Sequence, residues 1–378
     1  MSYSQTSYNR IFATLKRFGL KNIGGQSVRR LIVFALMITG LIRSGKAVLD
    51  KMAGKSTKHK NSKTESRTKR FNRWLRNKAV DKRTMYFPYI KEILAGISET
   101  SLIFTIDTSS LGKHCAVLMI SVIYQGRALP VIWTVREGNK GSFSEAEHIL
   151  LLTELYELLQ EIEEDLGKKL DVVVVGDSEF DGVEFQKECQ DYEWEYIVRA
   201  AKNINCYEEG EKEPFKPEDI VQKGEQVSVG GIEYTNARYG LVQIIAWWGE
   251  EYKEPIYLVT NVELAEEACE LYRKRSLIET FFADEKSRGF NIQKTRIRNP
   301  KRLEKLLLVA CFAYIWIVYL GAVARKEGKE VQFRRKDRRV LSLFQLGKDY
   351  LEYLLECAMP LPKGLLEPPE FWEESAWL

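Results

Sequence analysis

The sequence is poor in histidine and has no paired cysteines. It holds three histidines among 378 residues, and its six cysteines are scattered without a C-x-x-C pair. Zinc fingers need clusters of these residues at short spacings, so we expect none here. The scarcity of histidine also disfavours zinc-dependent hydrolysis and a Ser/His/Asp triad. Scattered cysteines and a start without an apolar signal-peptide core predict a protein of a reducing compartment, the cytoplasm.

Long apolar runs are almost absent as well. Residues 306–324, LLLVACFAYIWIVYLGAVA, are nineteen uncharged residues in a row, which is long enough to cross a bilayer. The run contains a cysteine, a glycine and two tyrosines, and we find no second run of its length to pair with it. A membrane helix and a helix buried in a large core are both open, and we favour the buried helix and no membrane partner.

The charge is unevenly distributed along the chain. The net charge is only +4, but residues 1–100 hold 22 Lys/Arg against 5 Asp/Glu. Residues 51–83 are the densest part, with 13 basic and 2 acidic residues. Such a block is typical either of a disordered basic linker or of a surface that binds a polyanion. Apolar residues at i, i+3 and i+4 (Phe71, Trp74, Leu75) would give a helix here one anchoring face. We therefore predict nucleic-acid binding, with contacts from Arg70, Arg73 and Arg76.

Helical patterns fill the first hundred residues, and strand patterns begin at 101. The expected helices cover 29–43, 46–53, 64–78 and 84–97. Three strands follow in SLIFTIDTSS, HCAVLMISVIYQG and RALPVIWTVR, and then a long helix that starts at the capping box of Ser144 and Glu147. The valine run of KKLDVVVVGDSEF is the next strand, followed by a helix at 182–191 and a strand at 194–200. This β-β-β-α-β-α-β order predicts a mixed α/β, ribonuclease H-like core.

A stretch of turns and short strands interrupts that core. It contains QVSVGGIEYTNARYG and LVQIIAWWG, and we interpret it as a β-strand insertion. The predicted organisation is therefore a helical basic domain, a core in two parts around the insertion, and a helical tail. The boundaries are 1–98, 99–201, 202–253, 254–345 and 346–378.

Three carboxylates stand where such a core places reactive groups. We expect Asp107 to end the first strand and Asp177 to follow the fourth, while Glu279 lies on a later helix. Carboxylate oxygens suit hard cations such as Mg²⁺, and two such ions can promote phosphoryl transfer. Each residue also has a structural alternative: Asp107 in a turn, Asp177 as a helix N-cap in competition with Asp181, and Glu279 in an ion pair with Arg275.

The segment LYRKRSLIETFFADEKSRGF, residues 271–290, predicts one charged helix. At about 100° per residue, Tyr272, Arg275, Glu279 and Lys286 share one stripe about 60° wide. Such a stripe suits either a phosphate and metal site or an ordinary solvated helix face.

The spacing Y-x2-R-x3-E-x6-K of these four residues, followed by Gly289, resembles the signature of DDE cut-and-paste transposases of the insertion-sequence-four family. The TIDTS strand, VVVVGDSEFDG and WEYIVRAAKN are similar to the surroundings of the family's first and second Asp and to the following strand. KTRIRNPKRLEKLLLVACFAYIWIVYLG resembles the end of its catalytic domain. The resemblance covers residues 100–345 well and the N-terminal part only in character.

This resemblance implies a function. Asp107, Asp177 and Glu279 would bind two Mg²⁺ ions, with Mn²⁺ as a substitute, while Tyr272, Arg275 and Lys286 would hold phosphates. The partners would be double-stranded DNA, as terminal inverted repeats and target, and a second copy in a synaptic homodimer. The protein would be cytoplasmic, on a bacterial nucleoid.

The family also stacks a flipped base on an aromatic side chain of the insertion region. The candidates here are Trp247, Trp248 and Tyr257, for which ordinary strand packing is the alternative. The basic cluster RRKDRR at 334–339 is either a second DNA contact or a solvated loop.

Two other functions are compatible with this sequence. One is a catalytically inactive relative that occupies DNA ends as a regulator. The other is a different ribonuclease H-like nuclease that acts on hybrids or junctions. The intact set of carboxylates disfavours the first, and the basic N-terminal part disfavours the second.

Overall fold

The computed structural model describes residues 2–19, 24–56, 62–138, 143–250, 252–333 and 341–365. Helices fill the N-terminal part, as expected. They are α1 (Tyr3–Gly19), α2 (Gly25–Ser44), α3 (Leu49–Lys55), α4 (Thr64–Arg76), α5 (Lys82–Met85) and α6 (Phe87–Ile97). The four helices predicted here are confirmed as α2, α3, α4 and α6, whereas α1 was missed. The cluster at 334–339 lies outside the described residues.

Residues 64–76 of the basic block form the helix α4. Phe71, Trp74 and Leu75 of α4 are 0%, 4% and 1% exposed. The Trp74 ring stacks on Phe34 of α2 at 5.6 Å between centroids, and its Nε1 donates a hydrogen bond to the Arg30 carbonyl at 3.0 Å. The predicted apolar face is therefore confirmed, and α4 is not a disordered linker.

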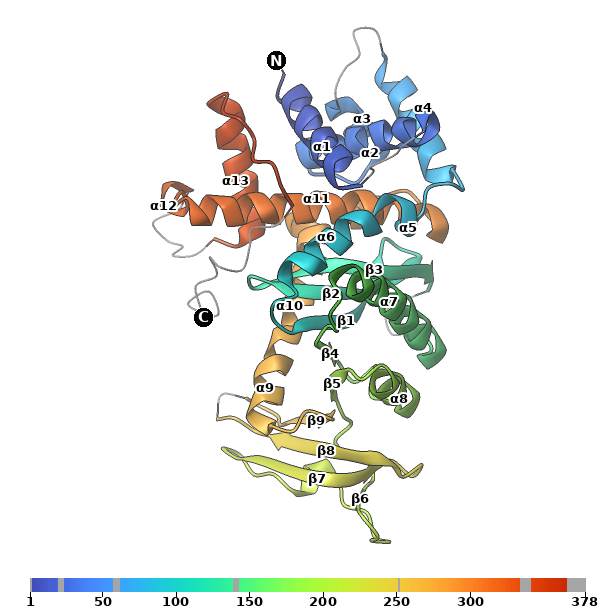
Figure 1. Cartoon of the computed structure of the whole chain (residues 1–378), viewed down its shortest axis with the longest axis vertical. Helices are drawn as coiled ribbons and strands as arrows, with labels where there is room; N and C mark the ends of the chain where they lie inside the picture. The colour runs from blue at the N-terminus through green and yellow to red at the C-terminus, as the bar shows by residue number, and fades with distance from the viewer. Residues whose placement is uncertain are drawn as a thin grey trace.

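A single mixed sheet forms the middle and the lower part of the molecule (Figure 1). Its order is β3-β2-β1-β4-β5-β9-β8-β7-β6. The first five strands are β1 (Leu102–Leu111), β2 (Cys115–Tyr124), β3 (Arg127–Glu137), β4 (Val172–Gly176) and β5 (Glu195–Arg199). β1, β2 and β3 are antiparallel neighbours, and β4 and β5 continue parallel to β1. The expected strand order and mixed α/β class are confirmed, with α7 (Glu145–Leu166) and α8 (Val183–Asp191) as connections.

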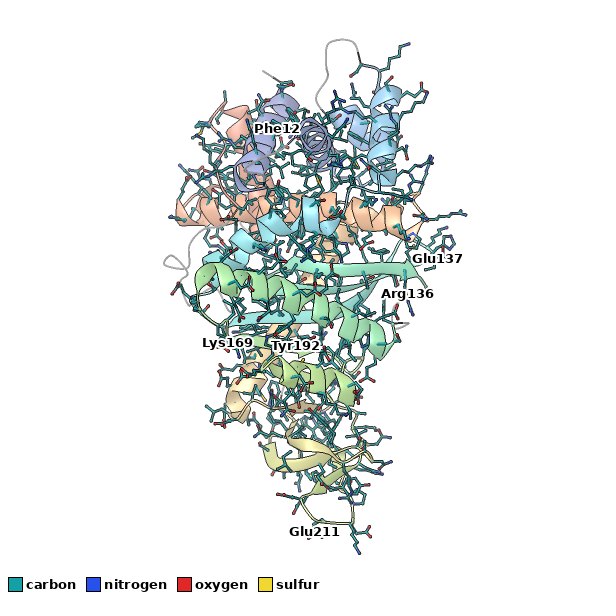
Figure 2. All side chains as sticks on the ribbon, turned by 45° about the vertical axis from the view of Figure 1, so that its right-hand side comes forward. Phe12, Arg136, Glu137, Lys169, Tyr192 and Glu211 are labelled. Carbon is teal, nitrogen blue, oxygen red and sulfur yellow. The ribbon has the colours of Figure 1, made fainter. Side chains whose placement is uncertain are left out.

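The strands of the 202–253 stretch extend this same sheet. They are β6 (Cys206–Glu208), β7 (Gln226–Tyr234) and β8 (Tyr239–Trp247), and a 3-10 turn, Pro217–Asp219, lies between β6 and β7. β8 pairs with β9 (Ile256–Thr260), which pairs with β5. Glu211, between β6 and β7, lies at the tip of the molecule that is farthest from α4 (Figures 1 and 2).

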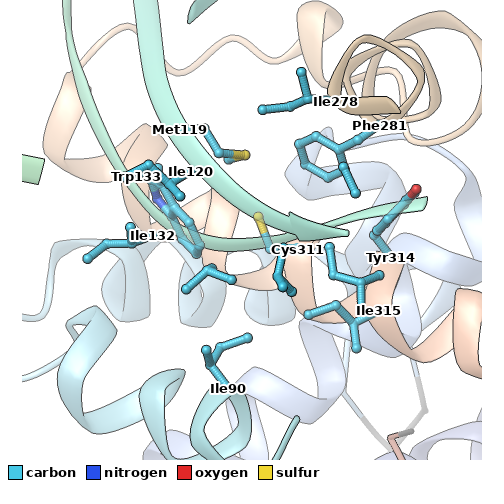
Figure 3. Packing of buried hydrophobic residues seen from close by; sticks show 14 of the residues in the cluster. Ile90, Met119, Ile120, Ile132, Trp133, Ile278, Phe281, Cys311, Tyr314 and Ile315 are labelled. Atoms are coloured by element: carbon cyan, nitrogen blue, oxygen red, sulfur yellow. The ribbon is translucent and has the colours of Figure 1, made fainter. Parts of the chain in front are cut away.

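The longest helix, α11 (Pro300–Lys326), is a core helix. Every residue of its apolar window is buried inside the protein, although both α11 and α2 are long and apolar enough to cross a membrane. Cys311, Tyr314 and Ile315 of α11 face side chains of β2, β3 and α10 (Figure 3). The last helices are α12 (Glu330–Phe333) and α13 (Leu343–Glu356), and α13 packs against α11.

The single regular helix predicted for 271–290 is wrong in detail. The segment consists of α9 (Ala265–Arg273), a 3-10 turn (Lys274–Ser276), α10 (Leu277–Ala283) and a π-turn (Asp284–Arg288). Lys286 has non-helical angles, φ −85° and ψ −106°. A further 3-10 turn, Ile292–Lys294, leads towards α11.

Candidate active site

Three charged residues stand in a row where the parallel strands stop pairing. Pairing of β1 with β4 ends at Ile106 and Gly176, and pairing of β4 with β5 ends at Gly176 and Val198. Asp107, Asp177 and Arg199 are the next residues on the three strands. Parallel strands lie about 4.8 Å apart, so the register brings the backbones of these residues close together.

Asp107 is not the end of its strand, contrary to the prediction. β1 continues to Leu111, and Asp107 pairs with Met119 of β2. The turn alternative is therefore wrong. Asp107 is 1% exposed, and its Oδ1 accepts a hydrogen bond from the Thr108 amide at 2.7 Å.

Asp177 begins the turn that follows β4. Its Oδ1 accepts a hydrogen bond from the Glu179 amide at 2.9 Å, which fixes the carboxylate close to its own backbone. The N-cap of α8 is Gly182, and the first-turn amides of Glu184 and Phe185 donate to Glu145 Oε1 of α7 at 3.0 and 3.3 Å. The N-cap alternative is therefore wrong for both Asp177 and Asp181.

Glu279 pairs with Arg275, as its structural alternative predicted. Arg275 Nη2 lies 2.9 Å from Glu279 Oε1, and the two side chains are 19% and 58% exposed. Burial lowers the pKa of Arg275, but the nearby Tyr272, Glu279 and Asp107 outweigh burial and raise it above its ordinary value. Arg275 therefore lies within electrostatic range of both Glu279 and the first-strand carboxylate.

Tyr272 of α9 lies within electrostatic range of the Asp177 carboxylate. Its side chain is 7% exposed, and burial raises the pKa of its hydroxyl. Arg275 and Arg199 lower this pKa, while Asp177 raises it, so all three charges act on the phenol.

Lys286 joins the site despite the irregular π-turn. Its Nζ donates a hydrogen bond to Ser109 Oγ at 2.7 Å. Ser109 is two residues beyond Asp107 on β1, and alternate residues of a strand face the same side of a sheet. The structure thus brings Arg275 and Lys286 to the strand that carries Asp107, and Tyr272 to Asp177.

The donor set suits a hard divalent cation such as Mg²⁺ or Mn²⁺. Asp107 and Asp177 are neighbouring carboxylates, and such ions prefer carboxylate oxygen and retain several waters. Across the described ranges, no three carboxylate, imidazole or thiol groups are gathered closely enough to hold an ion. Glu279 is engaged by Arg275 instead. We infer that Glu279 would have to leave Arg275 to complete the set.

Two features of the site were missed from the sequence. Arg199 looked like an ordinary end of a strand, and only the register places it beside Asp177. Glu179 is the second feature: its Oε2 accepts a hydrogen bond from Thr108 Oγ1 at 2.8 Å, and its Oε1 lies 3.8 Å from Nε2 of the buried His148. An acidic residue so soon after Asp177 was the only available signal.

The candidate stacking residues take part in packing. Trp247 is 6% exposed, with the Arg273 guanidinium 4.5 Å above its ring and Tyr252 at 5.1 Å. Tyr257 is also 6% exposed, and Trp248 is half-buried with its Nε1 bonded to the Tyr252 carbonyl. Strand packing thus accounts for their present contacts, and base stacking stays a prediction.

The predicted phosphate contacts of α4 differ in exposure. Arg73 and Arg76 are exposed, and Arg70 is half-buried. Arg67, by contrast, is buried and donates to the carbonyls of Ala53 and Ser62.

Solved structures give only distant likenesses. Human ENDOV has a TM-score of 0.24 and 13% identity, over 56% of this chain and 84% of that one. A Ciona intestinalis Endonuclease V in complex with a 24mer DNA has a TM-score of 0.26 and 12% identity, over 66% and 100%. Scores this low carry no argument about the chain.

The sequence comparisons are more decisive. No curated protein matches the chain. The family model of the transposase DDE domain matches residues 112–316, just over half of the chain. This match includes Asp177, Tyr272, Arg275, Glu279 and Lys286. The chain therefore belongs to the family of proteins with a transposase DDE domain.

Proposed function

We propose that the protein is a DNA transposase of the cut-and-paste type with a ribonuclease H-like core. The observation that carries this proposal is the register that sets Asp107 beside Asp177, with Arg275 and Lys286 reaching the same strand and Glu279 paired with Arg275. Membership of the transposase DDE domain family supports it.

The side chains have separate roles in this proposal. Asp107, Asp177 and Glu279 would hold two Mg²⁺ or Mn²⁺ ions, which activate a water or a 3′-hydroxyl and stabilise the leaving oxygen. Arg275 offers a planar fork to a phosphate, and Lys286 offers a point charge. Buried Tyr272 orients Arg275. From the resemblance to the insertion-sequence-four signature we further propose that the protein binds terminal inverted repeats and target DNA. It would act as a homodimer on paired ends.

The proposal also places the protein in the cytoplasm, on the nucleoid of a bacterium. The exposed Arg73 and Arg76 of α4, with Arg70 beside them, would bind the terminal repeats. Neutralising phosphates in this way releases counterions, so binding would weaken steeply as salt rises.

The test is cleavage of a plasmid that carries the element's flanking inverted repeats. We expect the wild type to cut at the repeat ends only with Mg²⁺ or Mn²⁺, and Glu279→Gln to bind these ends without cutting. Glu270→Gln removes an exposed carboxylate of the neighbouring α9 and should cut like the wild type.

Each other outcome selects a rival. Binding without cutting by the wild type, beside an active relative as a positive control, would favour the inactive end-binding regulator. Cutting of hybrids or junctions in preference to repeat ends would favour another ribonuclease H-like nuclease. Equal cutting by wild type and Glu279→Gln would show that Glu279 is not a ligand.

A further inference from the structure

The segment between the π-turn and α11 is strongly basic. Between Glu285 and Glu304, residues 286–303 hold seven Lys/Arg and no Asp/Glu. Four of these cations, Lys294, Arg296, Arg298 and Lys301, are exposed. None of the four has a carboxylate partner among the residues that the structure describes. A polyanion is the partner that such a surface fits.

Arg298, in the later part of this segment, lies against the turn between β1 and β2. Cys115 Sγ donates to the Arg298 carbonyl at 3.3 Å. A cavity of about 400 Å³ is lined by Lys113, His114, Glu137, Gly138 and Arg298. Lys113 and His114 are exposed, Lys113 adds a positive charge to the turn, and Glu137 is the one acid of the lining.

The residues that follow Arg298 reach α4. Arg302 Nη2 donates to Asn72 Oδ1 at 2.7 Å, and Lys305 Nζ donates to the Asn77 carbonyl at 2.6 Å. Arg73 and Arg76 are exposed on the same helix. Figure 2 shows Glu137 at the edge of the molecule, below the N-terminal end of α11 and the helices of the N-terminal part. Between the sheet and α4 the chain therefore exposes a set of basic side chains, which we call the basic strip: Lys113, His114, Lys294, Arg296, Arg298 and Lys301.

The strip lies at a useful distance from the candidate active site. Lys113 is six residues beyond Asp107, which is at most about 20 Å along an extended strand. At 3.4 Å per base pair, this corresponds to about six base pairs of duplex DNA. A duplex held by α4 and cut beside Asp107 would pass the strip on its way.

We propose that the basic strip binds the phosphate backbone of double-stranded DNA between the bond to be cut and the segment held by α4. This inference rests on the proposed function. Phosphate contacts of this kind fix the register of a duplex without reading its sequence. The strip would therefore determine which phosphate reaches Asp107, Asp177 and Glu279.

The test measures binding as a function of salt. The probe is a fluorescein-labelled random-sequence duplex of about 40 base pairs, roughly 130 Å long at 3.4 Å per base pair. The strip variant carries Lys294→Ala, Arg296→Ala, Arg298→Ala and Lys301→Ala. The control variant loses the same charge through Lys212→Ala, Lys216→Ala, Lys223→Ala and Lys326→Ala, which are exposed lysines away from the strip. All eight side chains are exposed, so thermal unfolding should stay unchanged.

We expect the plot of log K against log salt to become shallower in the strip variant by about 3.6, because each lost contact removes about 0.9. The control should change this slope by less than about one contact. A strip variant with the slope of the wild type, or a control with the same loss, would overturn the proposal.

Cleavage of the repeat plasmid separates this result from the proposed function. If the wild type cuts the plasmid and the strip variant keeps the salt slope of the wild type, only the proposal about the basic strip is overturned. If the salt slope depends on the strip but the wild type never cuts, the proposal about the basic strip is supported and the proposed catalytic function is overturned. A wild type that binds no duplex overturns both.

Discussion

Glu179 connects β1, which carries Asp107, with the turn after β4, which carries Asp177. Its amide holds Asp177, and its carboxylate accepts the Thr108 hydroxyl beside Asp107. Thr108 is 1% exposed, so this bond is shielded from water. We infer that Glu179 is a positioning residue that keeps the turn after β4 in place beside β1.

Replacing Glu179 should weaken catalysis through Asp107 and Asp177. We predict that Glu179→Ala lowers metal affinity or metal-dependent cleavage about 10–100-fold, as for outer partners of metal ligands. Glu179→Gln keeps an acceptor for Thr108 and should recover part of the loss. Spectroscopic measurement of Mn²⁺ binding, together with cleavage rates, distinguishes a weakened metal site from a loss of the fold. Unchanged Mn²⁺ affinity and rate in Glu179→Ala would contradict it, and Glu188→Gln on α8 is the control.

Glu285 is a buried acid without a visible catalytic role. It is 2% exposed, and neither carboxylate oxygen has a hydrogen-bond partner among the described residues. Burial, assisted by the neighbouring Asp284, raises the pKa of Glu285 well above its ordinary value. The native state therefore holds a proton that the unfolded chain releases as pH rises.

This proton makes stability depend on pH. Below the ordinary pKa of 4.5 both states are protonated, so Glu285 costs nothing extra. Above it, the free energy of unfolding falls by up to about 1.4 kcal/mol per pH unit until the folded pKa is passed. Glu285→Gln should therefore be more stable than the wild type at pH 8 and similar at pH 4.5. Urea unfolding at both pH values measures this. The same difference in stability between the variant and the wild type at both pH values would contradict it.

The sequence pointed to the carboxylates of the candidate site, whereas it gave no sign of the residues that contact them. Spacing within one segment and positions after apolar strands indicated Glu279, Asp107 and Asp177. Arg199 and Glu179 belong to the site through strand register and a hydrogen bond to Thr108, and neither leaves a periodic pattern in the sequence.

At the scale of elements, the π-turn shows where periodicity fails. The sequence 271–290 fits one helix, but a Cβ at Gly289 would lie 2.2 Å from the Asp284 carbonyl oxygen. That oxygen accepts from the Phe290 amide at 3.1 Å, so the chain turns there. Lys286 leaves the helical angles in this turn and still bonds to Ser109. Tertiary contacts of this kind cannot be deduced from a helical wheel.

The predicted end of β1 was wrong for a similar reason. β1 was expected to end at Asp107 but continues to Leu111, because β2 supplies partners along its whole length. The α-helices with strong apolar periodicity were predicted close to their observed bounds. The missed α1 carries polar residues on most of its surface and buries only a few side chains, among them Ile11 and Leu15.

The contact between α11 and α13 depends on glycine. A Cβ at Gly347 would lie 1.9 Å from the Ile317 carbonyl oxygen. We predict that Gly347→Ala destabilises the protein by about 1–3 kcal/mol, because the two helices must move apart. Gly54→Ala on α3 meets nothing within 4 Å and should instead stabilise by about 0.5–1 kcal/mol. Thermal unfolding of both variants checks this, and a neutral Gly347→Ala would contradict the close packing.

At the scale of the whole molecule, one helix holds the parts together. α11 contacts β3, α2, α4 and α13, so it joins the N-terminal helices, the sheet and the C-terminal helix. Tyr89 and Phe34 of the N-terminal part pack against its Phe312 at 5.1 and 5.7 Å. Each of these neighbouring elements therefore packs its interior face against α11.

The same arrangement decides between a core helix and a membrane helix. If α11 crossed a bilayer, the apolar faces of β3, α2 and α13 would lose their partner, and burying one large apolar side chain contributes about 1.5–3 kcal/mol. We predict that the full chain stays at the bottom of a density gradient when mixed with phosphatidylcholine vesicles, without detergent. A single-span membrane protein of known topology is the positive control and should float. Flotation of this chain with neutral vesicles would show that α11 leaves the core, whereas flotation only with anionic vesicles in low salt would show binding through its basic surface.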